Sequence, residues 1–219
     1  MLTVVVGCAE GPLWRLGVLN PWARRQWAEE AQYGPTIRQQ VSDLARLRRR
    51  AASMDPAEQD QICTQLARRL EESDSRQLRA AIALTLAEFP QPIAAQALHR
   101  ALTDSESTVR IAACEAWGKR ADQEALQALA RTVGSDTDLD VRITAARALA
   151  SFQDPVAIGA LGLALNDADP ALQRRAMESL QLVSGRDYGY DVEAWRTFIA
   201  GGEPAPERPS LAERLRNLY

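Results

Sequence analysis

The chain has 219 residues, of which 46% are hydrophobic and 25% charged, so one or two domains with a sizeable core are possible. The formal net charge of −3 argues against a nucleic-acid-binding protein, because such proteins usually present a strongly basic face. Cys8, Cys63 and Cys114 are widely spaced and odd in number. They therefore support neither a zinc ribbon nor a disulfide framework.

Residues 1–35 form an N-terminal extension with two notable features. The first is Val5-Val6-Gly7-Cys8, which is similar to the lipobox of bacterial lipoproteins, whose cysteine is acylated. This resemblance implies a lipid anchor at Cys8 and a place at the cell envelope. Only seven residues precede Cys8, and none of them is Lys or Arg, so a complete signal would need a start further upstream. The alternative is an accidental match in a cytoplasmic protein.

The second feature of the extension is its tryptophans, Trp14, Trp22 and Trp27. Residues 21–33 are predicted to be one helix. Asn20 is its expected N-cap, Pro21 lies in its first turn, and Gly34-Pro35 ends it. Because end repeats need a cap, we expect these rings to cover the open apolar face of the first hairpin. The other interpretation places them at a membrane interface beside an acylated Cys8.

Residues 36–200 are predicted to be an all-α solenoid of about five stacked antiparallel helical hairpins. The first hairpin covers residues 36–54 and 56–72. The following units can be aligned at Arg79, Arg110, Arg142 and Gln173, in steps of 31, 32 and 31 residues. Within a unit the apolar spacing is helical, as in Val109, Ala112, Ala113, Ala116 and Trp117. One hairpin cannot bury both of its faces, so neighbouring units must stack.

An aspartate six residues before an arginine, followed by an Ala-rich helix, resembles the HEAT repeat in its short bacterial form, the phycobilisome-lyase HEAT-like repeat. Two units match this pattern, with the pairs Asp104 and Arg110, and Asp136 and Arg142. In Asp74 and Arg79 the spacing is one residue short, and Gln173 replaces the last arginine. The resemblance implies a ladder of ion pairs that joins successive turns, with Arg110 and Arg142 as braces rather than ligands.

The solenoid is predicted to end in a cap and a tail. Residues 184–191 interrupt the repeat with glycines and aspartates, and Trp195, Phe198 and Ile199 continue as a capping helix. Residues 201–219 form a Pro/Gly linker and a short amphipathic helix with Leu211, Leu215 and Leu218 on one face. Such a short helix is marginal alone in water, so it must dock on this chain or on a partner.

The sequence contains no recognisable catalytic motif, so we expect neither an enzyme nor a cofactor or metal site. His99 is the only histidine, and the paired His-Glu motifs of a HEAT-like metal oxygenase are missing. Nucleotide-binding loops of the usual types are also missing. Because stacked repeats create extended binding surfaces, we expect an interaction scaffold for an unknown protein partner. The expected contacts are outward positions of the second helices, namely Gln96, Arg100, Gln127 and Arg131.

Two other functions remain open. The family name suggests an accessory, lyase-like or chromophore-related subunit, although nothing in the sequence identifies a chromophore pocket. The run Arg46, Arg48, Arg49 and Arg50 could bind an anionic ligand or nucleic acid, although a solvated helix face explains it as well.

Overall fold

A computed structural model describes residues 34–204. The predictions for Cys8, for the tryptophan segment and for the C-terminal amphipathic helix concern residues outside this range. Ten α-helices make up the described part, with a single 3-10 turn at Ala51–Ser53. They are α2 (Ile37–Arg50), α3 (Pro56–Glu72), α4 (Arg76–Leu86), α5 (Pro92–Ala101), α6 (Ser107–Arg120), α7 (Gln123–Ser135), α8 (Leu139–Leu149), α9 (Pro155–Ala164), α10 (Pro170–Ser184) and α11 (Val192–Ile199).

The chain divides into two compact units, Met1–Gln40 and Val41–Tyr219. In the described end of the first unit, Thr36 and Gln39 form a reciprocal capping box. The Thr36 N–H donates to Gln39 Oε1 at 2.8 Å, and the Gln39 N–H donates to Thr36 Oγ1 at 3.3 Å. Helix α2 therefore begins with two of its exposed N–H groups satisfied.

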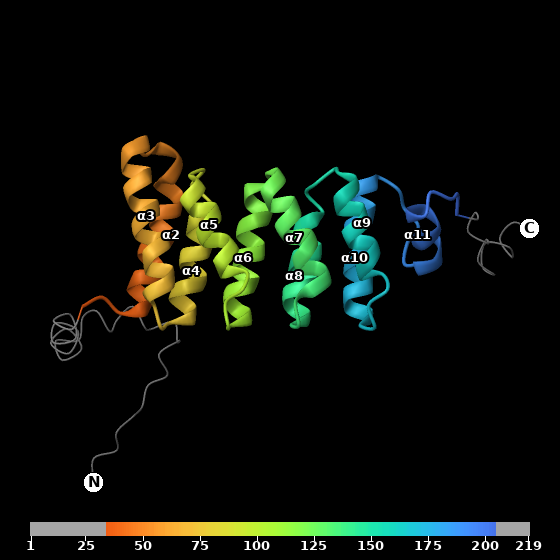
Figure 1. The fold of residues 1–219 in the computed structure, drawn as a ribbon, viewed down its shortest axis with the longest axis horizontal. Helices are drawn as coiled ribbons and strands as arrows, with labels where there is room; N and C mark the ends of the chain where they lie inside the picture. The colour runs from red at the N-terminus through yellow and green to blue at the C-terminus, as the bar shows by residue number, and fades with distance from the viewer. Residues whose placement is uncertain (1–33, 205–219) are drawn as a thin grey trace, which may run out of the picture. The chain divides into compact units, whose positions relative to one another are not determined.

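The second unit is a stack of hairpins in two layers (Figure 1). The first layer consists of α4, α6, α8 and α10, and the second layer contains α3, α5, α7, α9 and α11. Each helix packs on its hairpin partner, and most helices also pack on the next helix of their own layer. This arrangement is an α-solenoid, so the predicted fold class is confirmed.

Short polar side chains and prolines explain where the helices begin. Besides α2, seven helices start with a side chain that accepts a hydrogen bond from an N–H of the first turn. These side chains belong to Asp55, Ser75, Asp122, Asp138, Asp154, Asp169 and Asp191. Helices α3, α5, α9 and α10 carry a proline in the first turn, where its missing N–H costs nothing. Helix α10 ends at Gly185, which is left-handed with φ 67°.

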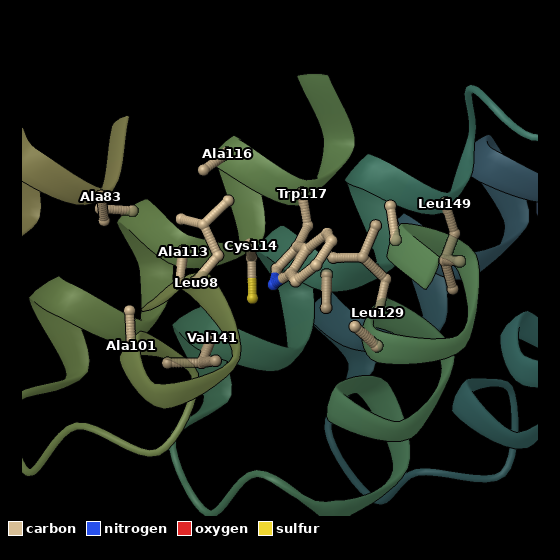
Figure 2. Close-up of a cluster of buried hydrophobic side chains, with 14 of the residues drawn as sticks. Ala83, Leu98, Ala101, Ala113, Cys114, Ala116, Trp117, Leu129, Val141 and Leu149 are labelled. Carbon is tan, nitrogen blue, oxygen red and sulfur yellow. The ribbon is translucent and has the colours of Figure 1, made fainter. Parts of the chain in front are cut away.

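The core runs continuously between the two layers. Trp117 of α6 is fully buried, and Figure 2 shows it among side chains of neighbouring helices, including Leu98 of α5 and Leu129 of α7. Small residues allow the first-layer helices to approach closely. A Cβ added to Gly118 would lie 2.8 Å from the Cβ of Ala148 on α8. The alanine bias of the sequence therefore reflects close packing between helices.

Candidate partner-binding surface

The four predicted contact residues all lie on exposed positions of the second layer. Gln96 and Arg100 are on α5, and Gln127 and Arg131 are on α7. The two pairs differ by 31 residues, so they occupy the same place on successive hairpins. The structure describes their exposure, and their role in binding stays a prediction.

The same pattern extends to α3, which the sequence analysis did not include. Gln65 and Arg69 are exposed there, again 31 residues before Gln96 and Arg100. The sequence signal for this extension is the apolar pattern of α3, which matches that of α5 at a distance of 31 residues. The matching buried residues are Cys63, Leu66, Ala67 and Leu70 in α3, and Ala94, Ala97, Leu98 and Ala101 in α5. Helices α3, α5 and α7, which follow one another in the second layer, therefore each present a glutamine and an arginine at equivalent positions. We call these six residues the Gln–Arg stripe: Gln65, Arg69, Gln96, Arg100, Gln127 and Arg131.

The stripe ends at α9. The equivalent positions there are Gly159 and Leu163, and the side chain of Leu163 is 65% exposed. The surface of the second layer therefore changes from polar and basic to apolar at this hairpin.

Acidic neighbours partly neutralise the stripe. Arg100 forms an ion pair with Glu71 of α3. His99 Nε2 lies 2.8 Å from Glu124 Oε1 of α7, and its ring lies 4.6 Å from that of Trp117. Within residues 34–204, Arg131 has no ion-pair partner. Exposed pairs contribute about 0–1 kcal/mol each, so a partner could replace them at little cost.

A hollow of about 360 Å³ opens beside Arg100. Its lining includes Glu71 from the end of α3, Arg79 from α4, and Asp104 and Ser105 from the loop before α6. Polar and charged side chains dominate the lining, which suits a hydrophilic group of a partner better than an apolar one.

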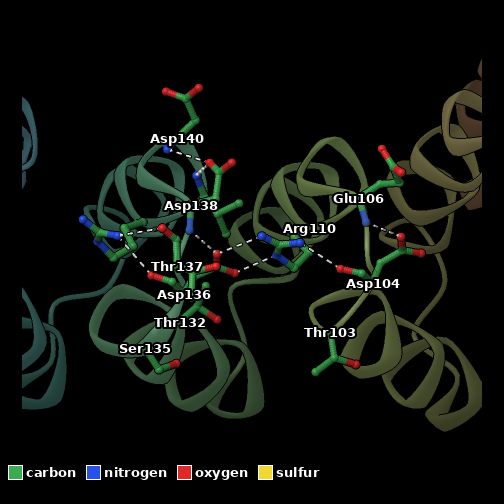
Figure 3. Close-up of polar contacts among 12 residues, drawn as sticks. Thr103, Asp104, Glu106, Arg110, Thr132, Ser135, Asp136, Thr137, Asp138 and Asp140 are labelled. Atoms are coloured by element: carbon green, nitrogen blue, oxygen red, sulfur yellow. Dashed lines mark hydrogen bonds and ion pairs between the residues drawn. The ribbon is translucent and has the colours of Figure 1, made fainter.

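Ion pairs join the hairpins along the loops between them (Figure 3). Arg110 donates from Nε and Nη2 to the two carboxylate oxygens of Asp136, at 2.8 and 3.0 Å. Its Nη1 donates to the backbone carbonyl of Asp104 at 2.8 Å. One arginine therefore joins the loop of its own hairpin to the loop of the next.

Arg79 occupies the same role one repeat earlier, although the sequence analysis did not include it in the ladder. Its Nε and Nη2 each lie 2.8 Å from the carboxylate of Asp104, and Nη1 donates to the carbonyl of Ser73 at 2.9 Å. Burial raises the pKa of the Asp104 carboxyl, but hydrogen bonds from Arg79 and from the Glu106 N–H outweigh burial and leave this pKa below its ordinary value.

The ladder weakens toward the end of the stack. Arg142 Nη2 lies 3.3 Å from Asp167 Oδ2, and Arg142 Nε is buried without a hydrogen-bond partner in the described part of the chain. Asp167 was not among the predicted ladder residues, and Gln173 stands where the next arginine of the ladder would be. Gln173 instead donates to the carbonyl of Asp167 at 2.7 Å and keeps only the local half of the arginine's contacts.

The described residues were compared with the requirements of a metal cluster and of a membrane-spanning helix. They contain no cluster of three or more His, Cys, Asp or Glu side chains that could hold a metal ion. Within residues 34–204, no helix combines the length and apolar character that a membrane span requires. In the basic run, Arg46 forms an ion pair with Asp43 on the same helix, and Arg49 and Arg50 are exposed.

Comparison with known proteins gives a family match for part of the chain. Residues 63–150, less than half of the 219, match the family model for HEAT repeats. No curated protein sequence matches the chain. Among solved structures, human deoxyhypusine hydroxylase in complex with glycerol matches with a TM-score of 0.50 and 22% identity. The match covers 57% of this chain and 44% of that one, so this chain spans less than half of the hydroxylase.

The hydroxylase match corrects one prediction. From the lack of recognisable catalytic motifs in the sequence, we expected that the chain is not an enzyme. That prediction is wrong, since a protein of this fold with HEAT-like repeats is an enzyme and the fold does not exclude catalysis. At 22% identity the likeness shows the fold alone, and it assigns no reaction and no catalytic residue to this chain.

Proposed function

We propose that this HEAT-repeat protein is a scaffold that binds a partner protein along the Gln–Arg stripe. HEAT repeats generally mediate protein–protein interactions, and stacked repeats provide an extended surface for them. The observation that carries the proposal is the common register of Gln65, Gln96 and Gln127 with an arginine four residues after each.

The chemistry of the stripe defines the partner. Glutamine amides donate and accept hydrogen bonds, so they suit the backbone of an extended segment. Arginines favour carboxylates, which they can bind with two parallel hydrogen bonds. A partner segment with acidic side chains at the spacing of the helices therefore fits best, and the apolar surface at Leu163 marks where its acidic part ends.

The proposal is tested with a photo-crosslinking amino acid at position 127 of the full chain, expressed in its native host. Position 147 on α8 is the matched control, because Arg147 is 55% exposed but lies in the other layer. We expect position 127 to capture a protein that position 147 does not, and Arg131→Glu to weaken binding of that protein by at least tenfold. Equal capture at both positions would contradict the proposal.

We further propose that Cys8 is acylated and tethers the scaffold at the cell envelope of a bacterium. The support is the lipobox-like sequence before Cys8. Intact-mass measurement of the mature protein, expressed from the full upstream reading frame, tests this. A diacyl or triacyl mass on Cys8, lost in Cys8→Ser, is expected. An unmodified Met1 would reject the anchor and direct the partner search to the cytosol.

A further inference from the structure

The last hairpin of the solenoid ends in the shortest described helix of its layer. Helix α11 has 8 residues, whereas α3, α5, α7 and α9 have 17, 10, 13 and 10. Ile199 at its end packs against Gly162 in the second half of α9, and Arg196 donates to the carbonyl of Leu165 at 3.2 Å. Helix α11 therefore covers the C-terminal half of α9 and ends before the N-terminal half.

A groove of about 530 Å³ lies where a longer helix would continue. Its apolar lining comes from three helices, with Pro155 and Ile158 of α9, Leu182 and Val183 of α10, and Phe198 of α11. Asp154 and Arg186 also line it. The groove therefore has an apolar floor with charged groups beside it.

Leu182 shows that this surface differs from its equivalents in earlier repeats. Its side chain is 67% exposed. The corresponding positions are Glu88, Lys119 and Ser151, of which Glu88 and Lys119 form an ion pair with each other. An exposed leucine has replaced polar residues only at the hairpin that borders the groove.

The chain itself supplies an occupant. Residues Gly201–Pro204 line a second hollow that shares Arg186 and Phe198 with the groove, so the described chain stops next to it. Five residues separate Pro204 from Ser210, and five extended residues span at most roughly 17 Å. The segment Ser210–Tyr219 then places Leu211, Leu215 and Leu218 at a spacing that puts them on one face of a helix.

We propose that the segment Ser210–Tyr219 binds in this groove and completes the C-terminal cap of the solenoid. A short tether gives the segment an effective concentration in the millimolar range, which favours it over a second copy of the chain. Burial against Ile158, Leu182 and Phe198 removes apolar surface of both partners from water. Terminal repeats need such a cap, because no further hairpin covers them.

The test is a double-mutant cycle in the full chain, with Leu215→Asp in the tail and Leu182→Asp in the groove. We expect each single variant to lower the thermal midpoint by about 2–6 °C. The double variant should fall no further than the worse single variant, because both remove the same contact. Leu163→Asp is the matched control, since Leu163 is 65% exposed on α9 and outside the groove lining. It should leave the midpoint unchanged and not couple to Leu215→Asp.

Additive losses in the double variant, or no loss in either single variant, would overturn the proposal. Coupling to Leu163 instead of Leu182 would place the tail elsewhere and also overturn it. A disulfide between Leu182→Cys and Leu215→Cys, in a Cys8→Ser background, distinguishes binding of the chain's own tail from binding of the tail of a second copy. A crosslink within one chain supports the proposal, and a crosslinked dimer shows that the tail of a second copy occupies the groove.

Discussion

The guanidinium of Arg110 makes two parallel hydrogen bonds to the carboxylate of Asp136, which lies in the loop before the following hairpin. Both side chains are largely buried, with exposed fractions of 13% and 8%. A pair in this setting is expensive to break, because the remaining charge stays in a poorly solvated site.

We therefore expect Arg110→Ala to lower the free energy of unfolding by roughly 3–5 kcal/mol. Urea denaturation of the full chain measures it. Arg147→Ala is the control, because Arg147 is 55% exposed and pairs with Glu115 at the surface, so the loss should be about 0–1 kcal/mol. Equal losses in the two variants would show that the ladder does not hold the repeats together.

The core between the layers gives a second prediction. Leu129 is fully buried, so Leu129→Ala should cost roughly 2–5 kcal/mol of unfolding free energy. The exposed Leu163 provides the comparison, and Leu163→Ala should change stability by less than about 0.5 kcal/mol. A thermal melt in which Leu129→Ala loses nothing would place this residue outside the core.

We expect the substitution of glycine by alanine to have opposite effects on stability at two helical positions, Gly118 and Gly134. Gly118→Ala puts a methyl group 2.8 Å from the Cβ of Ala148, which cannot move without its backbone, so we expect a loss of about 1–3 kcal/mol. Gly134 of α7 has no atom within 4 Å of its added Cβ. Gly134→Ala should stabilise the helix by up to about 1 kcal/mol. Stabilisation by both substitutions would contradict the close approach of α6 and α8.

The lowered pKa of Asp104 should make the stability of the fold depend on pH. Its folded-state pKa lies below the ordinary value of 3.8, so the unfolded chain binds the proton more tightly. Its contribution to stability is therefore fully present above about pH 5 and is lost as the pH falls through the folded-state pKa. The stability difference between wild type and Asp104→Asn should shrink below about pH 4. A stability difference that stays constant with pH for Asp104→Asn would reject the assignment.

The sequence predicted the fold well because the repeat period of 31 or 32 residues and the apolar spacing within each unit are both visible in it. Which carboxylate each arginine pairs with was harder to predict from the sequence. Asp74 and Arg79 have an irregular spacing, yet Arg79 is fully paired, because its carboxylate comes from Asp104 of the next repeat. Spacing within one unit therefore could not show which residues meet across two units.

The Gln–Arg stripe, which we propose as the binding surface, was visible in the sequence only in part for a similar reason. The alignment began at Arg79, so the stripe residues Gln65 and Arg69 of α3 were not compared with Gln96 and Arg100. Pairing between Arg100 and Glu71 also depends on how α3 and α5 pack, which a pattern of exposed positions does not contain. Catalysis was excluded from missing motifs, and the hydroxylase match shows why such an argument fails for this fold.

The central claim is that a partner protein binds along the Gln–Arg stripe. The most direct measurement is the affinity of the photo-captured partner for wild type, for Gln127→Ala/Arg131→Glu and for the other-layer control Arg147→Glu. The account predicts a Kd at least tenfold higher for the stripe variant, close to wild-type affinity for the control, and thermal midpoints that differ by no more than about 4 °C among the three proteins. Unchanged affinity in the stripe variant, or an equal loss in the control, would contradict it.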